Sequence, residues 1–286
     1  MTTAVIFPGQ GSQRKGMGEE FFDRYQDLVR QADSVLGYST RELCLADPDG
    51  RLGQTLYTQP ARYVVNALAW RAAVDDGLVA DIVLGHSVGE YAALFAAQVF
   101  DFATGLRLVL RRARAMAAVP GAMSVVLGLD AKRISLVLRT AGLTVIDLAN
   151  LNAVDQTVIA GPADEVAAAA APLVEAGAFA VRKLQVSGPF HSRYMRAAAR
   201  EFAREVHACP LAAPRIPVIA NRTAREYPAT GLGRLLIEQI DHQVLWAQSL
   251  SHILSRDPDV TFVELGGTPA LGSTVRRALR QAGRAS

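Results

Sequence analysis

The sequence has few cysteines and no long uninterrupted apolar run. These two features exclude several classes of protein. Cys44 and Cys209 are the only cysteines among 286 residues, and they lie far apart. They provide neither a disulfide framework nor a thiolate metal site. Charge or glycine interrupts each apolar run before it reaches the ~18 residues that a membrane-spanning helix needs. MTTAVIFPGQG at the start lacks the basic residues and apolar core of a signal peptide. We therefore expect a cytoplasmic protein without membrane association.

Nucleotide and nucleic-acid motifs are also missing. The glycine-bearing stretch FPGQGSQ at 7–13 has neither the GxGxxG of a dinucleotide-binding turn nor the Lys-Ser or Lys-Thr of a P-loop. Arginines cluster at 107–116 and 276–284 and the formal net charge is +3, but no aromatic residues interleave with these arginines. We therefore expect no nucleic-acid partner. The clusters suit an acidic protein partner, a phosphorylated ligand or a solvated helix surface.

The composition is typical of a globular enzyme with a substantial core. Of the 286 residues, 50% are hydrophobic and 20% are charged. Short strand-like stretches occur at 4–7, 81–85, 217–221 and 261–265, with helical patterns between them. This alternation predicts an α/β fold with a hydrolase-like core built on a mostly parallel sheet.

The segment 122–186 repeats a simple order of elements. Strand-like AMSVVLGL, helix-like AKRISLVLRTAG and strand-like TVIDLA are followed by strand-like QTVIAG, helix-like PADEVAAAAAPLVEAG and strand-like FAVRKLQV. Two successive strand-helix-strand units are typical of a small ferredoxin-like βαββαβ subdomain. We therefore expect a core made of 1–121 and 191–286, an inserted subdomain at 122–190, and an active site in the cleft between them.

The stretch GHSVGEY at 85–91 contains the candidate nucleophile. Its Gly-x-Ser-x-Gly lies between the apolar DIVLG and the helical pattern EYAALFAAQVF. A strand, a sharp turn and a helix around this pattern predict a nucleophile elbow, in which the hydroxyl of Ser87 stands exposed above the sheet edge. The five residues alone are equally compatible with a small residue at a tight turn.

A serine nucleophile needs a base, and the chain has five histidines. His191, in VSGPFHSRYM, follows a Gly-Pro pair at the expected boundary between insertion and core, where it can face the elbow. It is therefore our candidate base. We interpret His86 as packing at the turn. His207 and His252 belong to helical patterns, and His242 is a weaker candidate.

Acyl transfer also needs donors for the oxyanion that forms on the attacked carbonyl. The backbone N–H of Val88 follows the elbow serine and begins the next helix, so it is a natural donor. A second donor must come from another loop. The backbone N–H of Gln10 can approach closely because Gly9 and Gly11 on either side have no side chains.

Eight stretches follow one another in order along nearly the whole chain, from about residue 4 to about residue 275. They are FPGQGSQ, YTQPA at 57–61, GHSVGEYAAL, RRARAM, NAVDQTVIAG at 152–161, GPFHSRYM, NRTA at 221–224 and QIDHQVLW at 239–246. Together they resemble the malonyl-CoA:acyl carrier protein transacylases, a family that includes the acyltransferase domains of polyketide and fatty acid synthases. GEYAALFAAQVFDFATGL is most similar to the stand-alone acyltransferases of polyketide or mixed peptide-polyketide assembly lines.

The resemblance implies a ping-pong acyl transfer. Ser87 would be the nucleophile, and His191 the general base and later the acid. The backbone amides of Gln10 and Val88 would form the oxyanion hole. The main-chain carbonyl of Gln239 would orient the imidazole where a triad uses a carboxylate.

RRARAM resembles the family pattern Arg-Gly-x-x-Met, which places the carboxylate-binding arginine at Arg112 and the methionine at Met116. A planar guanidinium can hold a carboxylate by two parallel hydrogen bonds. Ala113 stands where the family usually has Gly, and Arg111 or Arg114 would be the ligand if the helix register differed.

Phe190 resembles the malonyl-selective pattern, because methylmalonyl-selective relatives usually carry Ser at that place. A bulky ring leaves little room for an α-branch, although one methyl group is typically worth only ~1–3 kcal/mol of discrimination. Gln59 and Asn152 are expected to line or brace the pocket.

The implied function is transfer of a malonyl group from malonyl-CoA, through an acyl-serine, to the phosphopantetheine thiol of an acyl carrier protein. We expect no metal and no bound cofactor, because the coenzyme A thioester is the substrate, and we expect a monomer. Carrier proteins are usually acidic, which makes the arginine-rich helices candidate docking surfaces.

Three alternatives remain open. A related hydrolase would clear acyl groups from stalled carrier proteins, but such hydrolases tend to lack the carboxylate-binding arginine. An ordinary α/β-hydrolase esterase usually has its histidine late in the chain, whereas 95 residues follow His191. A non-enzymatic docking subunit would not require the whole set of candidate residues.

Overall fold

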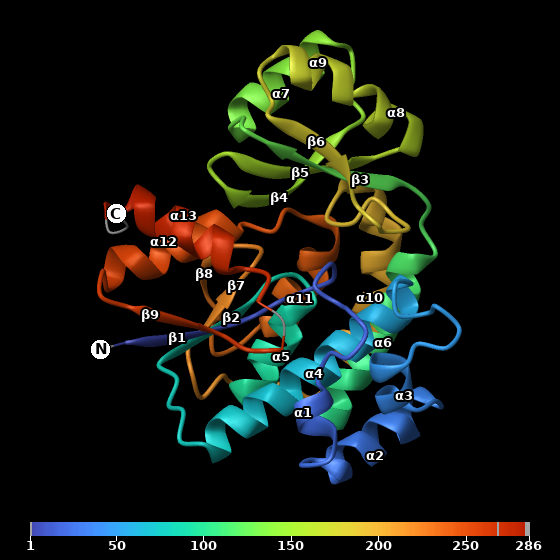
Figure 1. Ribbon diagram of the computed structural model, residues 1–286, viewed down its shortest axis with the longest axis vertical. Coiled ribbons are helices and arrows are strands. Elements are labelled where there is room, and N and C mark those ends of the chain that lie inside the picture. The colour runs from blue at the N-terminus through green and yellow to red at the C-terminus, as the bar shows by residue number, and fades with distance from the viewer. Residues whose placement is uncertain (1, 268, 284–286) are drawn as a thin grey trace.

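Two separate sheets organise the chain, and each carries its own helices (Figure 1). The computed structural model describes residues 2–267 and 269–283. The ranges expected for the core include residues 1, 268 and 284–286, which lie outside the described residues. The smaller sheet and its helices stand above the larger one in the view of Figure 1.

The elements alternate along the chain. The strands are β1 Thr3–Phe7, β2 Ile82–Gly85, β3 Ala122–Leu127, β4 Asp147–Ala153, β5 Gln156–Gly161, β6 Ala180–Lys183, β7 Val218–Ala220, β8 Arg225–Glu226 and β9 Thr261–Glu264. The helices are α1 Glu19–Phe22, α2 Gln26–Leu36, α3 Thr40–Leu45, α4 Thr55–Asp75, α5 Gly89–Ala96, α6 Phe102–Ala117, α7 Ala131–Thr140, α8 Ala163–Ala168, α9 Ala170–Glu175, α10 Arg196–His207, α11 Leu232–Asp241, α12 Trp246–Arg256 and α13 Gly272–Gln281, with the 3-10 helix η1 at Arg193–Met195.

The larger sheet has the order β8-β7-β2-β1-β9. β1 pairs in parallel with β2 and β9, β2 pairs in parallel with β7, and the two-residue β8 is antiparallel at the edge. The prediction of a mostly parallel α/β core is therefore confirmed. Its strands read as continuous apolar runs because both faces are covered. In β1, Val5 and Phe7 join the apolar cluster that includes residues of α4, α5 and α6, whereas Ala4 and Ile6 join the cluster with α12 and α13.

The smaller sheet has the order β4-β5-β3-β6, and all of its neighbours are antiparallel. Within this segment the order is second, third, first, fourth, which is the arrangement of a ferredoxin-like βαββαβ unit. Side chains of α7, α8 and α9 form a separate apolar cluster with strands of this sheet. We propose on this basis that 122–190 forms the inserted unit and that 1–121 and 191–286 form the other.

Three elements of the insertion differ from the sequence prediction. The strand expected at 144–149 runs over Asp147–Ala153, because residues before it form a turn in which Ile146 N donates to Leu143 O at 3.3 Å. The single helix expected at 162–177 is divided into α8 and α9. Pro172 has no N–H for the carbonyl four residues before it, which is that of the last residue of α8. The last strand is shorter than expected and ends at Lys183.

Backbone hydrogen bonds join the insertion to the core. Asn150 in β4 forms a parallel bridge with Val244. Leu151 N donates to Val244 O, and Val244 N donates to Ala149 O, both at 2.9 Å. Because Val244 lies between α11 and α12, these bonds hold β4 against the segment that follows α11.

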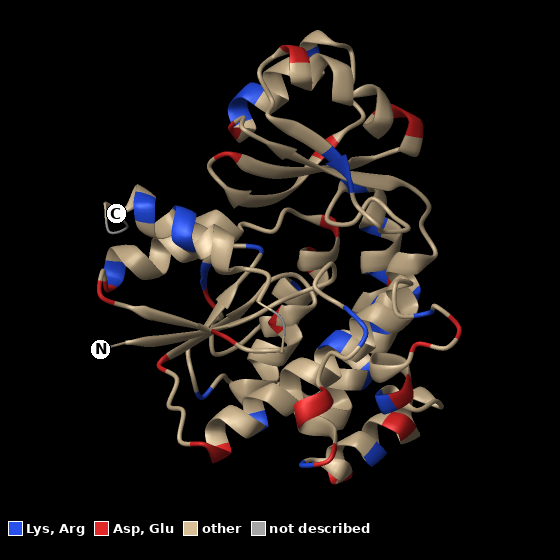
Figure 2. Cartoon of the chain, in the orientation of Figure 1, with Lys and Arg blue, Asp and Glu red and all other residues tan. Residues whose placement is uncertain are grey.

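Lys and Arg residues recur on the outer helices, including α7 and α13 (Figure 2). Among the described residues, the structure has no helix that combines the length and the apolar character needed to cross a bilayer. Arg277 in α13 donates to Asp155 Oδ1 at 2.8 Å, so this arginine of the basic cluster already has a carboxylate partner within the chain.

Glycines at both ends of the elbow are required by close backbone contacts. A Cβ on Gly85 would lie 2.0 Å from the carbonyl carbon of Gly89, and a Cβ on Gly89 would lie 2.3 Å from Phe7 O. Backbone atoms cannot move aside as a flexible side chain can. The strand-to-helix turn therefore depends on the absence of side chains at these two positions.

We predict that Gly85→Ala lowers the free energy of unfolding by about 3 kcal/mol or more, because overpacking against backbone has no inexpensive relief. Gly53→Ala is the matched control, since a Cβ there meets nothing within 4 Å. It should change the free energy by less than about 0.5 kcal/mol. Urea titration followed by circular dichroism measures both, and equal midpoints for the two variants would contradict the prediction.

Candidate active site

Ser87 occupies the elbow between β2 and α5. Its φ is 53°, in the left-handed region that non-glycine residues seldom adopt. Asn221, which directly follows β7, holds this conformation from two sides: its Oδ1 accepts from Ser87 N at 2.7 Å and its Nδ2 donates to Gly85 O at 2.7 Å. The strained turn is thus fixed by the neighbouring strand and presents the hydroxyl.

His191 faces Ser87 from the segment between β6 and η1. Its Nε2 lies 2.7 Å from Ser87 Oγ, and its Nδ1 lies 2.7 Å from the main-chain oxygen of Gln239. A carbonyl oxygen only accepts, so Nδ1 carries the hydrogen and Nε2 is left to accept from the serine hydroxyl. This is the tautomer that a general base for Ser87 requires.

The His191 imidazole is buried, with 3% of the residue exposed. Burial, together with the nearby positive charge of Arg112, lowers the pKa of His191 to about 3. The free site therefore holds a neutral imidazole across the physiological range.

Arg112 lies in α6 and is completely buried. Its Nη1 donates to Gln59 Oε1 at 2.6 Å, and its Nη2 donates to Gln239 Oε1 at 2.9 Å and to Ser87 Oγ at 3.1 Å. The structure therefore brings the guanidinium and the serine hydroxyl into direct contact. Burial lowers the pKa of Arg112, but its ordinary value is so high that the group stays charged.

Arg112 lies on the buried face of α6, whereas the arginines next to it lie on the exposed face. Arg111 and Arg114 are exposed, and Arg111 pairs with Glu205 at 3.7 Å on the surface. Ala113 is buried, so the residue that replaces the usual glycine packs inside the core. Of the three candidate arginines, only Arg112 points into the site.

The two expected oxyanion donors flank the elbow. Neither the backbone N–H of Gln10 nor that of Val88 has a hydrogen-bond partner among the described residues. Gly9 brings the first loop close, because a Cβ there would lie 2.3 Å from His86 O. The Gln10 side chain turns aside and donates to Thr55 Oγ1 at 3.1 Å.

The remaining expected residues form supporting contacts. Gln59 Nε2 lies 3.8 Å from Met116 Sδ, so α4 and α6 are in contact beside Arg112. Asn152 Oδ1 lies 2.8 Å from His86 Nε2, which places Asn152 as a brace for the elbow histidine. Phe190, 5% exposed, packs in the main core cluster next to His191.

In the part of the chain that the structure describes, none of the other histidines forms a hydrogen bond with Ser87 Oγ. The His86 ring is half-buried and meets Trp246 edge to face. His207 ends α10 and His252 lies in α12, away from the elbow. His242 Nδ1 contacts Asp241 and Glu238 instead.

Sequence reasoning gave no role to three residues behind the elbow: Glu90, Asn221 and Tyr227. Glu90 is completely buried and accepts hydrogen bonds from the Tyr227 hydroxyl, Gln239 Nε2 and Asn221 N. Its position one helical turn after Ser87 was the available signal, because that spacing turns the side chain under the elbow.

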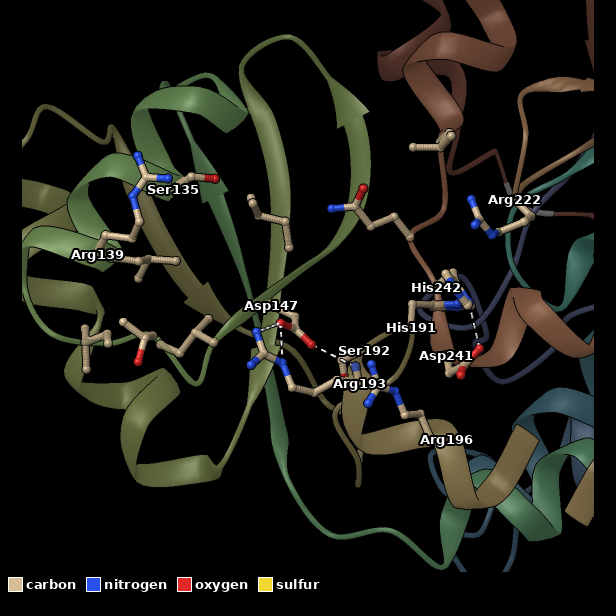
Figure 3. Close-up of a pocket in the computed structure, with 17 residues that line it drawn as sticks. Ser135, Arg139, Asp147, His191, Ser192, Arg193, Arg196, Arg222, Asp241 and His242 are labelled. Carbon is tan, nitrogen blue, oxygen red and sulfur yellow. Dashed lines mark hydrogen bonds and ion pairs between the residues drawn. The ribbon is translucent and has the colours of Figure 1, made fainter. Parts of the chain in front are cut away.

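A cavity of about 770 Å³ reaches His191 from the junction of insertion and core (Figure 3). Side chains of α7 and β4 line one side, and residues from η1, α10 and the segment after α11 line the other. Arginines surround it: Arg139, Arg193, Arg196 and Arg222. Ser87 lies one hydrogen bond beyond His191. Within the described ranges, no three His, Cys, Asp or Glu side chains are grouped as metal ligands.

An elbow serine bonded to a histidine, on an α/β core with a ferredoxin-like insertion, defines an enzyme that transfers acyl groups. Residues 4–286 match the family model described as the acyl transferase domain. The chain belongs to this family.

Curated relatives include both short and long proteins. The polyketide biosynthesis protein ThaF of Burkholderia thailandensis is 48% identical over 285 residues, which are 99% of this chain but 25% of that protein. The chain thus spans a quarter of ThaF. The polyketide biosynthesis malonyl CoA-acyl carrier protein transacylase PksC of Bacillus subtilis is 43% identical, and the match covers 97% of each chain.

Solved structures agree with this placement. The malonyl CoA-acyl carrier protein transacylase of Burkholderia pseudomallei superposes with a TM-score of 0.95 at 44% identity, covering 98% of this chain and 99% of that one. The corresponding enzyme of Coxiella burnetii gives a TM-score of 0.93 at 32% identity, covering 98% and 92%.

The buried neutral imidazole predicts a flat pH profile for acylation of Ser87. Between about pH 8 and about pH 5.5 the rate should change less than about twofold, whereas a histidine with an ordinary pKa near 6.5 would lose about tenfold. Rapid-quench mass spectrometry with acetyl-CoA measures the rate, because the acetyl group adds no titrating carboxylate. Circular dichroism at each pH controls for unfolding. A tenfold loss by about pH 5.5 in folded protein would contradict this expectation.

Proposed function

We propose that the chain transfers a malonyl group from malonyl-CoA to the phosphopantetheine thiol of an acyl carrier protein, through an ester on Ser87. One observation carries the proposal: Ser87 Oγ contacts both the Nε2 of His191 and the Nη2 of Arg112. A nucleophile next to a base performs acyl transfer, and a buried cation next to that nucleophile favours an acyl group with its own carboxylate.

The first half-reaction forms the acyl-serine. Ser87 Oγ attacks the thioester carbonyl while His191 Nε2 takes the hydroxyl proton, and the N–H groups of Gln10 and Val88 stabilise the oxyanion. Collapse breaks the carbon–sulfur bond, and the leaving thiolate receives the proton from His191. The Gln239 carbonyl accepts from Nδ1 throughout and stabilises the imidazolium. The carrier thiol then attacks the ester by the same steps in reverse.

Arg112 explains why a carboxylated acyl group is favoured. In the free site its two terminal nitrogens bind neutral oxygens of Gln59, Gln239 and Ser87. A carboxylate offers charge-assisted, bidentate hydrogen bonds, which are stronger than those to neutral oxygens. The bulk of Phe190 beside His191 supports malonyl over α-branched analogues.

The cavity beside His191 provides the entrance for the pantetheine arm. Arg193 is bonded to Asp147 and Arg222 pairs with Glu238 at 3.3 Å. Arg139 and Arg196 have no ion-pair partner among the described residues, which leaves two cations for the phosphate at the end of the arm or for an acidic carrier.

All groups that the reaction uses come from one chain, so we propose that a monomer is competent. Nucleophile, base and oxyanion donors are protein groups, and the proposed chemistry needs no cofactor besides the thioester substrate. The hydrolase alternative uses the same Ser87 and His191 and differs in the acceptor, which is water.

Intact-protein mass after brief incubation with malonyl-CoA or acetyl-CoA tests the proposal. The parent should carry more malonyl than acetyl, and Ser87→Ala should carry neither. Arg112→Ala should lose malonyl loading by about 10- to 100-fold, because a buried charge-assisted hydrogen bond contributes about 1.5–3 kcal/mol, while its acetyl loading falls less. Absence of a malonyl adduct on the parent, or its rapid loss to water without a carrier, would reject the transferase in favour of the hydrolase.

The entrance is tested by charge reversal. Arg139→Glu combined with Arg196→Glu should raise the KM for malonyl-CoA or for the carrier by about tenfold, since each charge in a focusing cleft affects encounter. Arg276→Glu is the matched control on α13, where the exposed side chain lies outside this cavity. If the control raises the KM and the double variant does not, the basic helix α13 is the docking surface instead.

A further inference from the structure

Glu90 is a buried carboxylate with no chemical step assigned to it. It lies in the first turn of α5 and is 0% exposed. Burial raises the pKa of Glu90 to about 7. A carboxylate can only accept hydrogen bonds, so burial is tolerated only where donors meet both of its oxygens.

The donors come from segments more than 130 residues later in the chain. The Tyr227 hydroxyl donates to Oε1. Gln239 Nε2 donates to Oε2 at 2.7 Å, and Asn221 N donates to the same oxygen at 3.2 Å. Glu90 therefore joins α5 to the segment after β7 and to α11.

The Gln239 side chain connects this carboxylate to Arg112. An amide has one end that donates and one that accepts, and Glu90 demands the donating end. With Nε2 turned toward Glu90 and toward Ser87 O, which is 2.9 Å away, Oε1 is left to accept from Arg112 Nη2 at 2.9 Å. A reversed amide would place N–H groups against the N–H groups of the guanidinium.

Glu90 is also the acidic group that acts on Arg112 from a distance. No carboxylate lies within 4 Å of the Arg112 nitrogens in the described ranges 2–267 and 269–283. Burial lowers the pKa of the Arg112 guanidinium, which Tyr91 and then Glu90 raise. Burial raises the pKa of the Glu90 carboxyl, which its three hydrogen bonds and then the charge of Arg112 lower. The two groups are thus not in direct contact, and the Gln239 amide connects them by one hydrogen bond to each.

We propose that Glu90 is a positioning residue for acyl selection: it fixes the Gln239 amide and thereby orients the Arg112 guanidinium beside Ser87 for a carboxylated acyl group. This inference rests on the proposed function. Glu90 does not touch the acyl group. It acts because its side chain is long enough to accept a hydrogen bond from the Gln239 amide.

The Ser87–His191 pair provides an internal reference. The Gln239 oxygen that accepts from His191 belongs to the backbone of α11 and does not depend on the side-chain amide. Acetyl transfer needs the serine, the base and the oxyanion donors but no carboxylate ligand. The ratio of malonyl to acetyl loading therefore isolates the orientation of Arg112.

Two conservative variants distinguish the effect of the side-chain length of Glu90 from the effect of its charge. Glu90→Asp keeps the charge but shortens the side chain by one methylene, so the 2.7 Å contact with Gln239 is lost. Glu90→Gln keeps the reach without the charge: its oxygen can accept from Gln239 and Asn221, while its amide nitrogen donates to the Tyr227 oxygen. Thermal unfolding of each variant controls for stability, and Glu90→Ala replaces Glu90→Asp if the latter does not fold.

The malonyl-to-acetyl ratio of kcat/KM for Ser87 loading should fall about tenfold in Glu90→Asp and stay within about threefold of the parent in Glu90→Gln. In an Arg112→Ala background, Glu90→Asp should not lower the ratio further, because both changes remove the same contribution.

A parallel fall of malonyl and acetyl loading would assign Glu90 a purely structural role and overturn the inference. An unchanged ratio in Glu90→Asp, or a fall in Glu90→Gln alone, would overturn it too. Failure of the parent to load malonyl would instead reject the proposed function, so the two failures are distinguishable.

Discussion

The site depends on the complete burial of one positive charge. A guanidinium without water is tolerated only where hydrogen-bond acceptors replace the solvent. For Arg112 these acceptors are neutral: the amide oxygens of Gln59 and Gln239 and the hydroxyl of Ser87. The Tyr91 ring faces the same group at 5.7 Å. Much of the attraction of the charge is therefore left for an anion that enters, and the polar groups of α4, α5, α6 and α11 are arranged around it.

The sequence predicts most of the fold because its signals are periodic and local. Short apolar strands at 4–7, 81–85, 217–221 and 261–265 all appear in the larger sheet. The ferredoxin-like order of the insertion follows from its repeated strand-helix-strand pattern. The helix expected at 162–177 is divided because the effect of Pro172 on the turn before it outweighs the helix propensity of the alanines.

The site is only partly predictable, and the limit is contact across long stretches of chain. Ser87 is found from its elbow pattern and His191 from its place between insertion and core. Gln239 enters only through the family resemblance. Glu90 follows Ser87 by one helical turn and Asn221 begins NRTA, but neither position reveals that the two residues meet each other and Tyr227, since these contacts join residues 131 and 137 positions apart. Which buried polar groups meet in a core is decided by packing, which spacing along the chain does not reveal.

The backbone conformation at position 87 also restricts which hydroxyl-bearing residue fits there. Ser87 and His191 have φ values of 53° and 60°, so both members of the pair sit in the left-handed region. A branch at Cβ makes that region a genuine outlier. Threonine would offer an equivalent hydroxyl at position 87, but its extra methyl group conflicts with the turn. The conformation of the turn therefore favours serine over threonine at this position.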